Sequence, residues 1–537
     1  SKGVDGSSKA AESSDKADSS VSDYDNTTSE PETDKPEFDL NDSVIGFSQK
    51  SGFYDSGFNL ELTANEGEKI YYTTDGTDPR TSDTREEYTA PIEIKDRSND
   101  PNVVSAVPTE MISGNFNEFS FGEGDFWCNK KAPSDNAVDK CTVIRASSEK
   151  SDGSVSKSFS GSFYIGSAEE HIKGLKESCE AAGHDLAVMN ITMDYADLFD
   201  SKIGIYVKGD IFNKALEDYK ASGESIENET ARQLDANYKQ RGKEWERDCH
   251  IELNEISAEG NVTNALSQDC GIRIQGNYSR SDLQKGFRLY ARKKYGEKKF
   301  KYEVFEGLKN ASDETIDSFK TLTLRAGGNC AFTAKFNDTY WQSLMTELDG
   351  STKASRPCVV YLNGEYWGLY VLEEDYSDNY FESHYGVNKD DVVVYKGDAE
   401  TYQSGYKLDE GKLPEGETDE GYFFKELTDF FASHKDLSAQ ADYEEFSKLV
   451  DTDSVRDYFL AEVWINNKWD WPGKNWSMWK VQNTDSSNEY ADGKWRFMFY
   501  DVEFGGVSGE GDAWTNTMKA VSYTHLRAHE TRSNLVC

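Results

Sequence analysis

The chain has few basic residues and no long hydrophobic run, and these two absences exclude several classes of protein. Lys and Arg number 59 against 99 Asp and Glu, which gives a formal net charge of −40 at pH 7. Nucleic acids and anionic membranes would repel such a chain, so neither is expected as a partner. No stretch approaches the ~18 consecutive apolar residues of a membrane-spanning helix, so no membrane span is predicted.

Cysteine motifs are also missing, although the chain contains eight cysteines. None forms a C-x-x-C pair, which argues against a zinc site or a thioredoxin motif. Cys128 and Cys141 could form a disulfide within one domain, as could Cys249 and Cys270; isolated buried thiols explain the same residues equally well. The chain has no initiating methionine and no signal peptide before Ser1, so we expect a processed or trimmed form.

Apolar residues are almost absent from residues 1–40, which consist mainly of Ser, Asp, Glu, Lys and Thr. A segment of this composition buries too little surface to offset the entropy lost on ordering. We expect a disordered tether that holds the folded domains away from a cell surface.

From Val44 the sequence changes to short alternating stretches typical of β-strands. Asp75-Gly76 is a strong signal for a tight turn between two of them. The strand-like stretches are FNLELTA, KIYYTTDG, PIEIKD, CTVIRASSEK and KSFSGSFYIG. Their spacing predicts a small all-β, Ig-like sandwich over residues 44–166, which we expect to fold separately from the rest of the chain.

Residues 168–518 mix strand-like and helical stretches and predict an α+β fold. GIRIQGNYSR, KGFRLYARKKYG and FKTLTLRAGGN are strand-like, and KFNDTYWQSLMTELDG (335–350) has the period of a helix. Asn363-Gly364 is the turn pair of a hairpin between two β-branched and aromatic runs. Three helical stretches come after the hairpin: GYFFKELTDFFASH, YEEFSKLV and SVRDYFLAEVWINN. This is the order of a two-lobed kinase-like fold, which other α+β folds share.

An acid, an amide and a second acid come after these helices. Asn475 lies five residues after Asp470, and Asp501 ends the strand-like run KWRFMFY. In the protein-kinase template, the first Asp accepts the proton of the acceptor hydroxyl, and the Asn and the later Asp hold Mg²⁺. Mg²⁺ needs only one or two carboxylates, because phosphates and waters complete its shell. On spacing alone, a solvated loop between two core strands is the simpler interpretation.

Basic residues gather in the strand-like stretches of the α+β region, where a triphosphate could bind. For most of them, exposure on a solvated strand face is the expected role. Lys285 and Arg273 are the exceptions that we select, because Gly286 and Gly276 lie close by and let the backbone approach a ligand. The group comprises Arg273, Arg280, Lys285, Arg288, Arg292, Lys293 and Lys294.

Several stretches in this order resemble the spore-coat protein H (CotH) kinase family: GIYVKGD, RGKEWERD, GIRIQGNYSR, KGFRLYARKKYG, LTLRAGGN, RPCVVYLNGEYWGLYVLEEDY and YDVEFGG. The resemblance covers the whole α+β region. It implies an atypical protein kinase with a divergent two-lobed kinase fold that uses ATP and Mg²⁺. It also implies that Asp470 is catalytic, that Asn475 and Asp501 bind the metal, and that Lys285 contacts the phosphates with Arg273 as its companion.

The chain departs from the protein-kinase pattern at three places. No GxGxxG loop precedes Lys285, although GIRIQGNYSR could cover the phosphates instead. Lys468-Trp469 stands where kinases have His-Arg. A polar insertion, QNTDSSNEYADG, lies between Asn475 and Asp501.

The earlier β region resembles the chitobiase C-terminal type of Ig-like domain, through FSQKSGFYDSGFNLELTANEGEKIYYTTDGTDP. Modules of this type accompany bacterial extracellular proteins, often carbohydrate-related ones. The resemblance implies an accessory domain without chemistry, an extracellular or cell-surface location in a bacterium, and association with a cell surface or carbohydrate.

Together these features predict a secreted or surface-associated kinase that transfers the γ-phosphate of ATP to a hydroxyl of a protein substrate. The alternative is a non-catalytic extracellular protein in which a degenerate kinase fold and the Ig-like module bind protein or glycan. The set of an acid, an amide and a second acid distinguishes the kinase from the binding protein, because a degenerate site is expected to lose part of this set.

The last residues, VSYTHLRAHETRSNLVC, are suddenly rich in His and Arg, unlike the acidic chain before them. They resemble the translation of sequencing-adapter read-through in metagenomic gene models. We therefore exclude residues 521–537 from fold and function, and we expect that the natural protein continued beyond Lys519.

Overall fold

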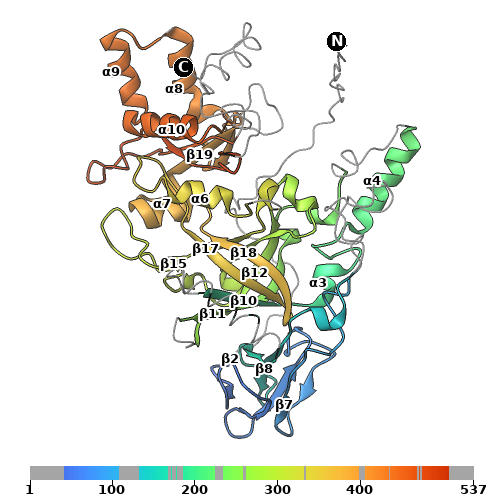
Figure 1. The fold of residues 1–537 in the computed structure, drawn as a ribbon. Coiled ribbons are helices and arrows are strands. Elements are labelled where there is room, and N and C mark those ends of the chain that lie inside the picture. The colour runs from blue at the N-terminus through green and yellow to red at the C-terminus, as the bar shows by residue number, and fades with distance from the viewer. Residues whose placement is uncertain are drawn as a thin grey trace.

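A computed structural model describes most of the chain (Figure 1). The described ranges are 41–107, 132–166, 186–223, 234–257, 262–331, 334–397, 406–434, 436–467 and 475–506, with His171, Gly174, Glu177 and Trp471 as single residues between them. The predictions for residues 1–40, residues 521–537, Cys128 and Asp470 fall outside these ranges. No helix of the described residues is long and apolar enough to cross a membrane.

An all-β domain occupies one end of the molecule (Figure 1, blue). A five-stranded sheet of order β2-β9-β8-β5-β6 packs with two short sheets, β1-β4 and β3-β7. Alternate side chains, among them Leu60, Ile144 and Phe163, form its core, as the sequence alternation predicts. The strands are β1 (Gly46–Phe47), β2 (Gly52–Phe53), β3 (Phe58–Leu60), β4 (Leu62–Thr63), β5 (Lys69–Thr73), β6 (Glu86–Glu87), β7 (Ile92–Ile94), β8 (Cys141–Glu149) and β9 (Phe159–Tyr164).

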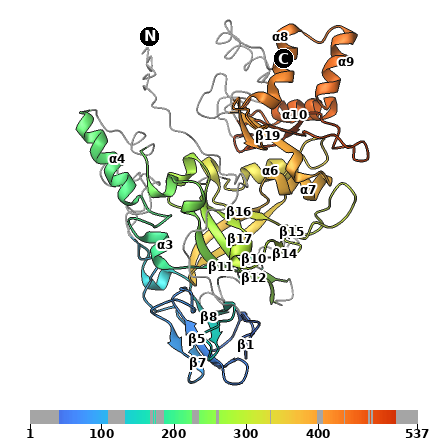
Figure 2. The same cartoon turned by 180° about the vertical axis from the view of Figure 1, so that it is seen from behind.

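A closed barrel forms the centre of the molecule (Figure 2). Its order is β10-β11-β12-β13-β16-β18-β17, closed by parallel pairing of β10 with β17. Asn363 (φ 48°) and Gly364 (φ 79°) make the turn between β17 and β18, which confirms the predicted hairpin. The strands are β10 (Leu186–Thr192), β11 (Arg247–Ile256), β12 (Val262–Gln275), β13 (Gly286–Tyr290), β16 (Thr321–Arg325), β17 (Ser355–Leu362) and β18 (Glu365–Glu373).

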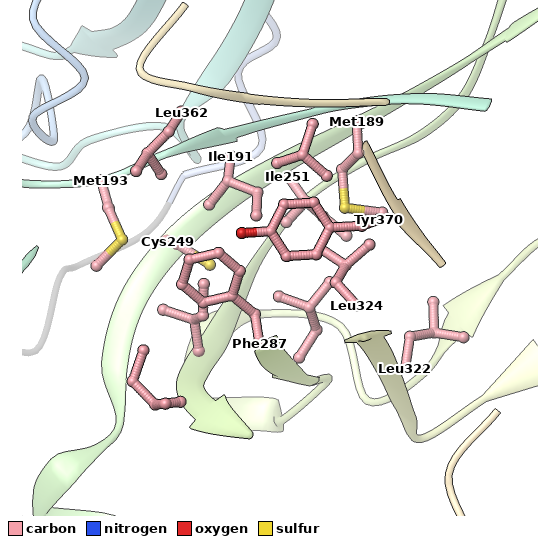
Figure 3. Close-up of a cluster of buried hydrophobic side chains, with 14 of the residues drawn as sticks. Met189, Ile191, Met193, Cys249, Ile251, Phe287, Leu322, Leu324, Leu362 and Tyr370 are labelled. Carbon is pink, nitrogen blue, oxygen red and sulfur yellow. The ribbon is translucent and has the colours of Figure 1, made fainter. Parts of the chain in front are cut away.

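Apolar side chains fill the barrel, so it is a packed core rather than a pore (Figure 3). Met189 and Ile191 of β10, Leu322 and Leu324 of β16, and Tyr370 of β18 all enter this cluster and are 0 % exposed. Residues two apart on a strand share a face, which explains why these pairs point inward together.

Short helices and one small hairpin surround the barrel. They are α3 (Tyr195–Phe199), α4 (Gly209–Ser222), α6 (Asn337–Ser343), and the paired β14 (Phe300–Lys301) and β15 (Ser318–Phe319). The helix predicted for residues 335–350 is therefore shorter than expected. After Ser343 the chain forms tighter turns, in which Leu344 N donates to Trp341 O at 3.1 Å and Leu348 N to Met345 O at 3.0 Å.

The last part of the described chain is a four-stranded sheet with helices, at the opposite end from the all-β domain (Figure 1). Its order is β20-β19-β21-β22. The elements are α7 (Asp378–Tyr385), β19 (Val392–Gly397), β20 (Tyr406–Glu410), α8 (Lys425–Ser433), α9 (Gln440–Leu449), α10 (Thr452–Trp464), β21 (Ser477–Val481) and β22 (Arg496–Met498). The protein is thus a mixed α and β fold preceded by an all-β domain.

The all-β domain and the barrel share a buried interface. Cys141 N donates to Gly364 O at 2.7 Å, and the ring of Tyr164 packs edge-on against Tyr361 with centroids 5.2 Å apart. All of these belong to the two elements that meet there, β8 and β9 on one side and the β17–β18 hairpin on the other. Removal of the all-β domain would expose this surface, and its separate folding stays a prediction.

Ion pairs cross the same interface. Asp269 of β12 lies 2.9 Å from His250 Nδ1 and 3.4 Å from both Arg145 and Arg80 of the all-β domain. Burial would raise the pKa of Asp269, but His250 and the two arginines hold it below its ordinary value. Because these groups are buried, loss of one partner would leave uncompensated charge.

Glu252 gives this interface a pH dependence. It is buried, it accepts from Ser51, Ser162 and Asn264, and burial raises its pKa from 4.5 to about 7. Between these two pH values the Glu252 carboxyl stays protonated in the folded state but is ionised in the unfolded chain. Its contribution to the stability of the fold is therefore fully present below pH 4.5 and is lost as the pH rises through 7. One pKa unit corresponds to about 1.4 kcal/mol, so the loss is at most about 3 kcal/mol.

We expect the parent to lose up to about 3 kcal/mol more unfolding free energy between pH 5 and pH 8 than Glu252→Gln does. Urea unfolding at several pH values measures this difference. Glu61→Gln, an exposed change in the all-β domain, should match the parent. Parallel pH profiles for the parent and Glu252→Gln would show that this carboxyl does not titrate as described.

Candidate functional site

The candidate site forms where the end of β16 meets the chain after β22. Arg325, the last residue of β16, donates through Nη2 to Asp501 Oδ1 and to Glu503 Oε2, both at 2.8 Å. Its Nη1 lies 3.6 Å from Asp338 Oδ2 of α6. One guanidinium group thus joins the barrel, α6 and the segment 501–506.

Asn475 and Asp501 are brought together at the same place. Asn475 Nδ2 lies 3.3 Å from Asp501 Oδ2, although the residues are 26 positions apart. Both have a φ of 56°, a left-handed conformation that costs free energy for residues other than glycine. Such conformations concentrate at functional sites, where the surrounding structure holds them in place. The side chain of Asp501 is also 30 % exposed, whereas that of Glu503 is 2 % exposed.

Helix α6 fixes the backbone after Asp501. Asp338 Oδ1 accepts from Val502 N at 2.8 Å. Asn337 Nδ2 donates to Gly505 O at 3.0 Å, and Trp341 Nε1 donates to the same oxygen at 2.7 Å. Side chains of one short helix therefore hold this segment at both Val502 and Gly505, which sets the direction of the Asp501 carboxylate.

Glu503 is held by the turn after β16. Its Oε1 accepts from Asn329 N at 3.2 Å and from Asn329 Nδ2 at 2.5 Å. Gly328 must be glycine here, because its φ is 54° and a Cβ would lie 2.2 Å from Glu503 Oε2. The carboxylate therefore sits directly against the Gly-Gly turn.

Three carboxylates surround the guanidinium group of Arg325, those of Asp338, Asp501 and Glu503. Burial disfavours charge on Arg325, yet the three negative charges hold its pKa well above the ordinary value. Burial also opposes ionisation of Asp338, but Arg325 and Lys353 hold its pKa below the ordinary value. For Glu503, burial and the charge of Asp501 dominate and raise the pKa to about 7. The three carboxylates outnumber the single guanidinium group, and this excess of negative charge favours binding of a further cation.

The donor set fits Mg²⁺ bound together with a phosphate ligand. Among the described residues, no group of three or more His, Cys, Asp or Glu could hold a metal ion by itself. Asp501 and Asn475 offer a partly exposed carboxylate and an amide. Mg²⁺ commonly takes one or two protein oxygens and completes its octahedron with phosphate oxygens and waters.

The predicted basic residues have other partners. Lys285 is 0 % exposed; its Nζ donates to Asp282 O at 2.6 Å and lies 4.1 Å from the ring centre of Tyr238. Arg273 of β12 donates to Glu246 Oε2 at 2.8 Å. Burial alone would raise the pKa of Glu246, but Arg292 and the other cations around it lower this pKa to about 2. Their predicted contact with phosphate stays a prediction, and the position of Asp470 falls outside the described residues.

Sequence reasoning missed Arg325, Asp338 and Glu503. Arg325 and Glu503 lie within stretches that carry the family resemblance, LTLRAGGN and YDVEFGG. An arginine shortly before two glycines at a strand end, and an acid two residues after Asp501, were signals that could have identified them.

These features define a mixed α and β protein with a candidate site for a divalent cation and a phosphate ligand. Residues 272–531 match the family model described as CotH kinase protein, and residues 49–107 match the chitobiase/β-hexosaminidase C-terminal domain. These two matches, in this order along the chain, confirm the resemblance predicted from the sequence. The first match extends into residues 521–531, inside the segment predicted to be non-native. No curated protein matches the chain.

Proposed function

We propose that the protein is an atypical protein kinase that transfers the γ-phosphate of ATP to a hydroxyl of a protein substrate with the help of Mg²⁺. The contact between Asn475 and Asp501 carries this proposal, because two residues selected as metal ligands from the sequence meet at 3.3 Å. The match of residues 272–531 to the CotH kinase protein family supports the reaction class.

Asp501 and Asn475 would hold Mg²⁺. When bound, the ion neutralises negative charge on the phosphate oxygens during transfer. Arg325 orients Asp501 through one carboxylate oxygen, Oδ1, while Asn475 contacts the other, Oδ2. The protein thus positions this carboxylate before any ligand arrives, which reduces the cost of ordering it on binding.

A two-lobed arrangement is part of the proposal. The barrel would form one lobe, and the sheet of β19–β22 with α8, α9 and α10 the other (Figure 1). Arg325 ends a barrel strand, whereas Asn475 and Asp501 flank the strands β21 and β22 of the second sheet. A site built from both parts supports this division, because kinases bind nucleotide between their lobes.

Asp470 would accept the proton of the acceptor hydroxyl. The described residues on either side of it are anchored: Asn467 is 0 % exposed and donates to Glu462 Oε2 at 3.0 Å, and Trp471 is 2 % exposed. Fixed flanking residues suit a catalytic carboxylate, because general bases act only at hydrogen-bond distance from the proton.

An extracellular or cell-surface location is also proposed. It rests on the chitobiase-type domain, which further supports association with carbohydrate. The alternative function, non-catalytic binding of protein or glycan, is favoured by one observation: Arg325 already neutralises Asp501, as it would in a site that has lost its metal.

Replacement of Asp470 by asparagine tests the proposal. We expect phosphate transfer to fall by ~10²–10⁴-fold, the usual contribution of a general base, while Mg²⁺-dependent ATP binding stays near the parent's. Radiolabelled transfer to the protein itself or a generic acceptor, beside calorimetric titration with ATP, measures both. Asp83→Asn, an exposed change in the all-β domain, is the control. Undiminished transfer by Asp470→Asn would remove Asp470 from this role, and a parent without transfer would favour the binding function.

A further inference from the structure

Lys335 lies between β16 and α6 in the chain, and its ammonium group donates hydrogen bonds to uncharged acceptors. Nζ donates to Gln284 Oε1 at 2.6 Å and to Ala326 O at 2.8 Å. Within the part of the chain that the structure describes, no carboxylate forms an ion pair with it. Partial burial therefore lowers its pKa to about 8, with no negative charge to offset this effect.

Two cations of the barrel region have a carboxylate partner instead. Lys353 Nζ lies 2.9 Å from Glu373, and Arg288 lies 2.9 Å from Asp375. Lys320 also donates to a backbone oxygen, Ala291 O, at 2.7 Å, but Lys335 is the lysine that lies beside the strand end of Arg325. An incoming anion would gain a charge-assisted hydrogen bond there without first displacing a carboxylate.

Lys335 also lies against the turn that leads away from Arg325. A Cβ on Gly327, whose φ is 109°, would lie 2.9 Å from Lys335 Cγ, so the lysine side chain crosses the backbone at this glycine. Ala326, which accepts from Nζ, is the residue directly after Arg325 in the chain, and Arg325 contacts Asp501 at 2.8 Å. The ammonium group is therefore fixed to the same strand end that holds the proposed metal ligand.

We propose that Lys335 binds a phosphate group of the polyphosphate ligand whose metal ion is held by Asp501 and Asn475. This inference rests on the proposed function and adds a residue to its site. Lys335 is partly exposed, whereas Lys285 is fully buried, so Lys335 is the more accessible of the two lysines.

Calorimetric titration of the full chain with three ligands tests the proposal: Mg·ATP, sodium tripolyphosphate and adenosine. Lys335→Met should weaken binding of Mg·ATP and of tripolyphosphate by about tenfold or more, the loss of one charge-assisted hydrogen bond. Adenosine lacks phosphate and should bind as it does to the parent. Lys335→Arg should restore most of the affinity, and Lys50→Met, an exposed change in the all-β domain, should change nothing. Lys335→Gln, which keeps a donor without the charge, replaces Lys335→Met if the latter does not fold.

The outcomes separate this inference from the proposed function. Lys335 is not a phosphate ligand if Lys335→Met binds tripolyphosphate and Mg·ATP like the parent, or if its affinity for adenosine falls by the same factor. The kinase proposal would then still stand on Asp501 and Asn475. If the parent binds tripolyphosphate through Lys335 but does not bind ATP, the anion site stands and the kinase proposal fails. If the parent binds none of the three, both fail.

Discussion

Asp501→Asn is expected to abolish the effect of Mg²⁺ on ATP affinity and to reduce phosphate transfer by on the order of 10²–10³-fold or more. The reason is the loss of the only carboxylate that the structure places both in contact with Asn475 and partly open to solvent, among the described residues. The amide keeps the shape of the side chain, so Arg325 retains a hydrogen-bond acceptor. Titration with ATP with and without Mg²⁺, beside radiolabelled transfer, measures both effects.

The comparison of ligands makes this result specific. ATP without Mg²⁺ should bind Asp501→Asn about as well as it binds the parent, because the substitution removes the proposed metal ligand and no predicted phosphate contact. Asp83→Asn again serves as the control, since its side chain is exposed in the all-β domain. A variant that still binds Mg·ATP more tightly than ATP alone would show that Asp501 is not the metal ligand.

Arg325→Met is expected to have the largest effect on stability, a loss of roughly 3–5 kcal/mol of unfolding free energy. Methionine fills a similar volume but leaves the buried carboxylates of Asp338 and Glu503 without their shared cation. Breaking a buried ion pair from one side is costly because the remaining charge stays out of water. Urea unfolding monitored by tryptophan fluorescence measures the loss.

Two further variants identify the cause. Arg325→Met combined with Glu503→Gln should recover part of the lost stability, because one uncompensated carboxylate is removed. Arg456→Met, which deletes an exposed arginine paired with Asp453 and Asp457 on α10, should change the unfolding midpoint little. Equal midpoints for Arg325→Met and Arg456→Met would mean that the Arg325 cluster does not stabilise the fold.

Local patterns in the sequence were sufficient for several elements. The Asn363-Gly364 turn was predicted from residues that tolerate positive φ, and the strands of the all-β domain from alternation of apolar residues. Asn475 and Asp501 were selected as metal ligands through the kinase template and the family resemblance, not from spacing alone. The structure places them 3.3 Å apart, and their metal-binding role stays a prediction.

Long-range partners could not be predicted in the same way. Arg325 and Asp501 are 176 residues apart, and nothing in either local sequence indicates that one pairs with the other. Arg273 was selected as a phosphate contact and Arg292 was expected on a solvated strand face, but both pair with Glu246, which lies 27 residues before Arg273. Their local sequence shows the positive charges and gives no sign of this buried partner.

The helix predicted over 335–350 is longer than the observed one, and the interface of the all-β domain with the barrel was not predicted at all. Helical periodicity continues past Ser343, yet the regular helix ends there and tighter turns follow, in which Leu344 N donates to Trp341 O. The change of pattern near Gly166 gives no sign of the contacts between Tyr164 and Tyr361 or between Arg145 and Asp269, because these partners are far apart in the sequence.

The central claim is that Asn475 and Asp501 form a Mg²⁺ site for a nucleotide. Calorimetric titration of the full chain with ATP, in the presence and in the absence of Mg²⁺, tests it most directly. The account predicts clear binding of Mg·ATP and much weaker binding of ATP alone. Binding of ATP with the same affinity under both conditions, or no binding of Mg·ATP at all, would contradict it.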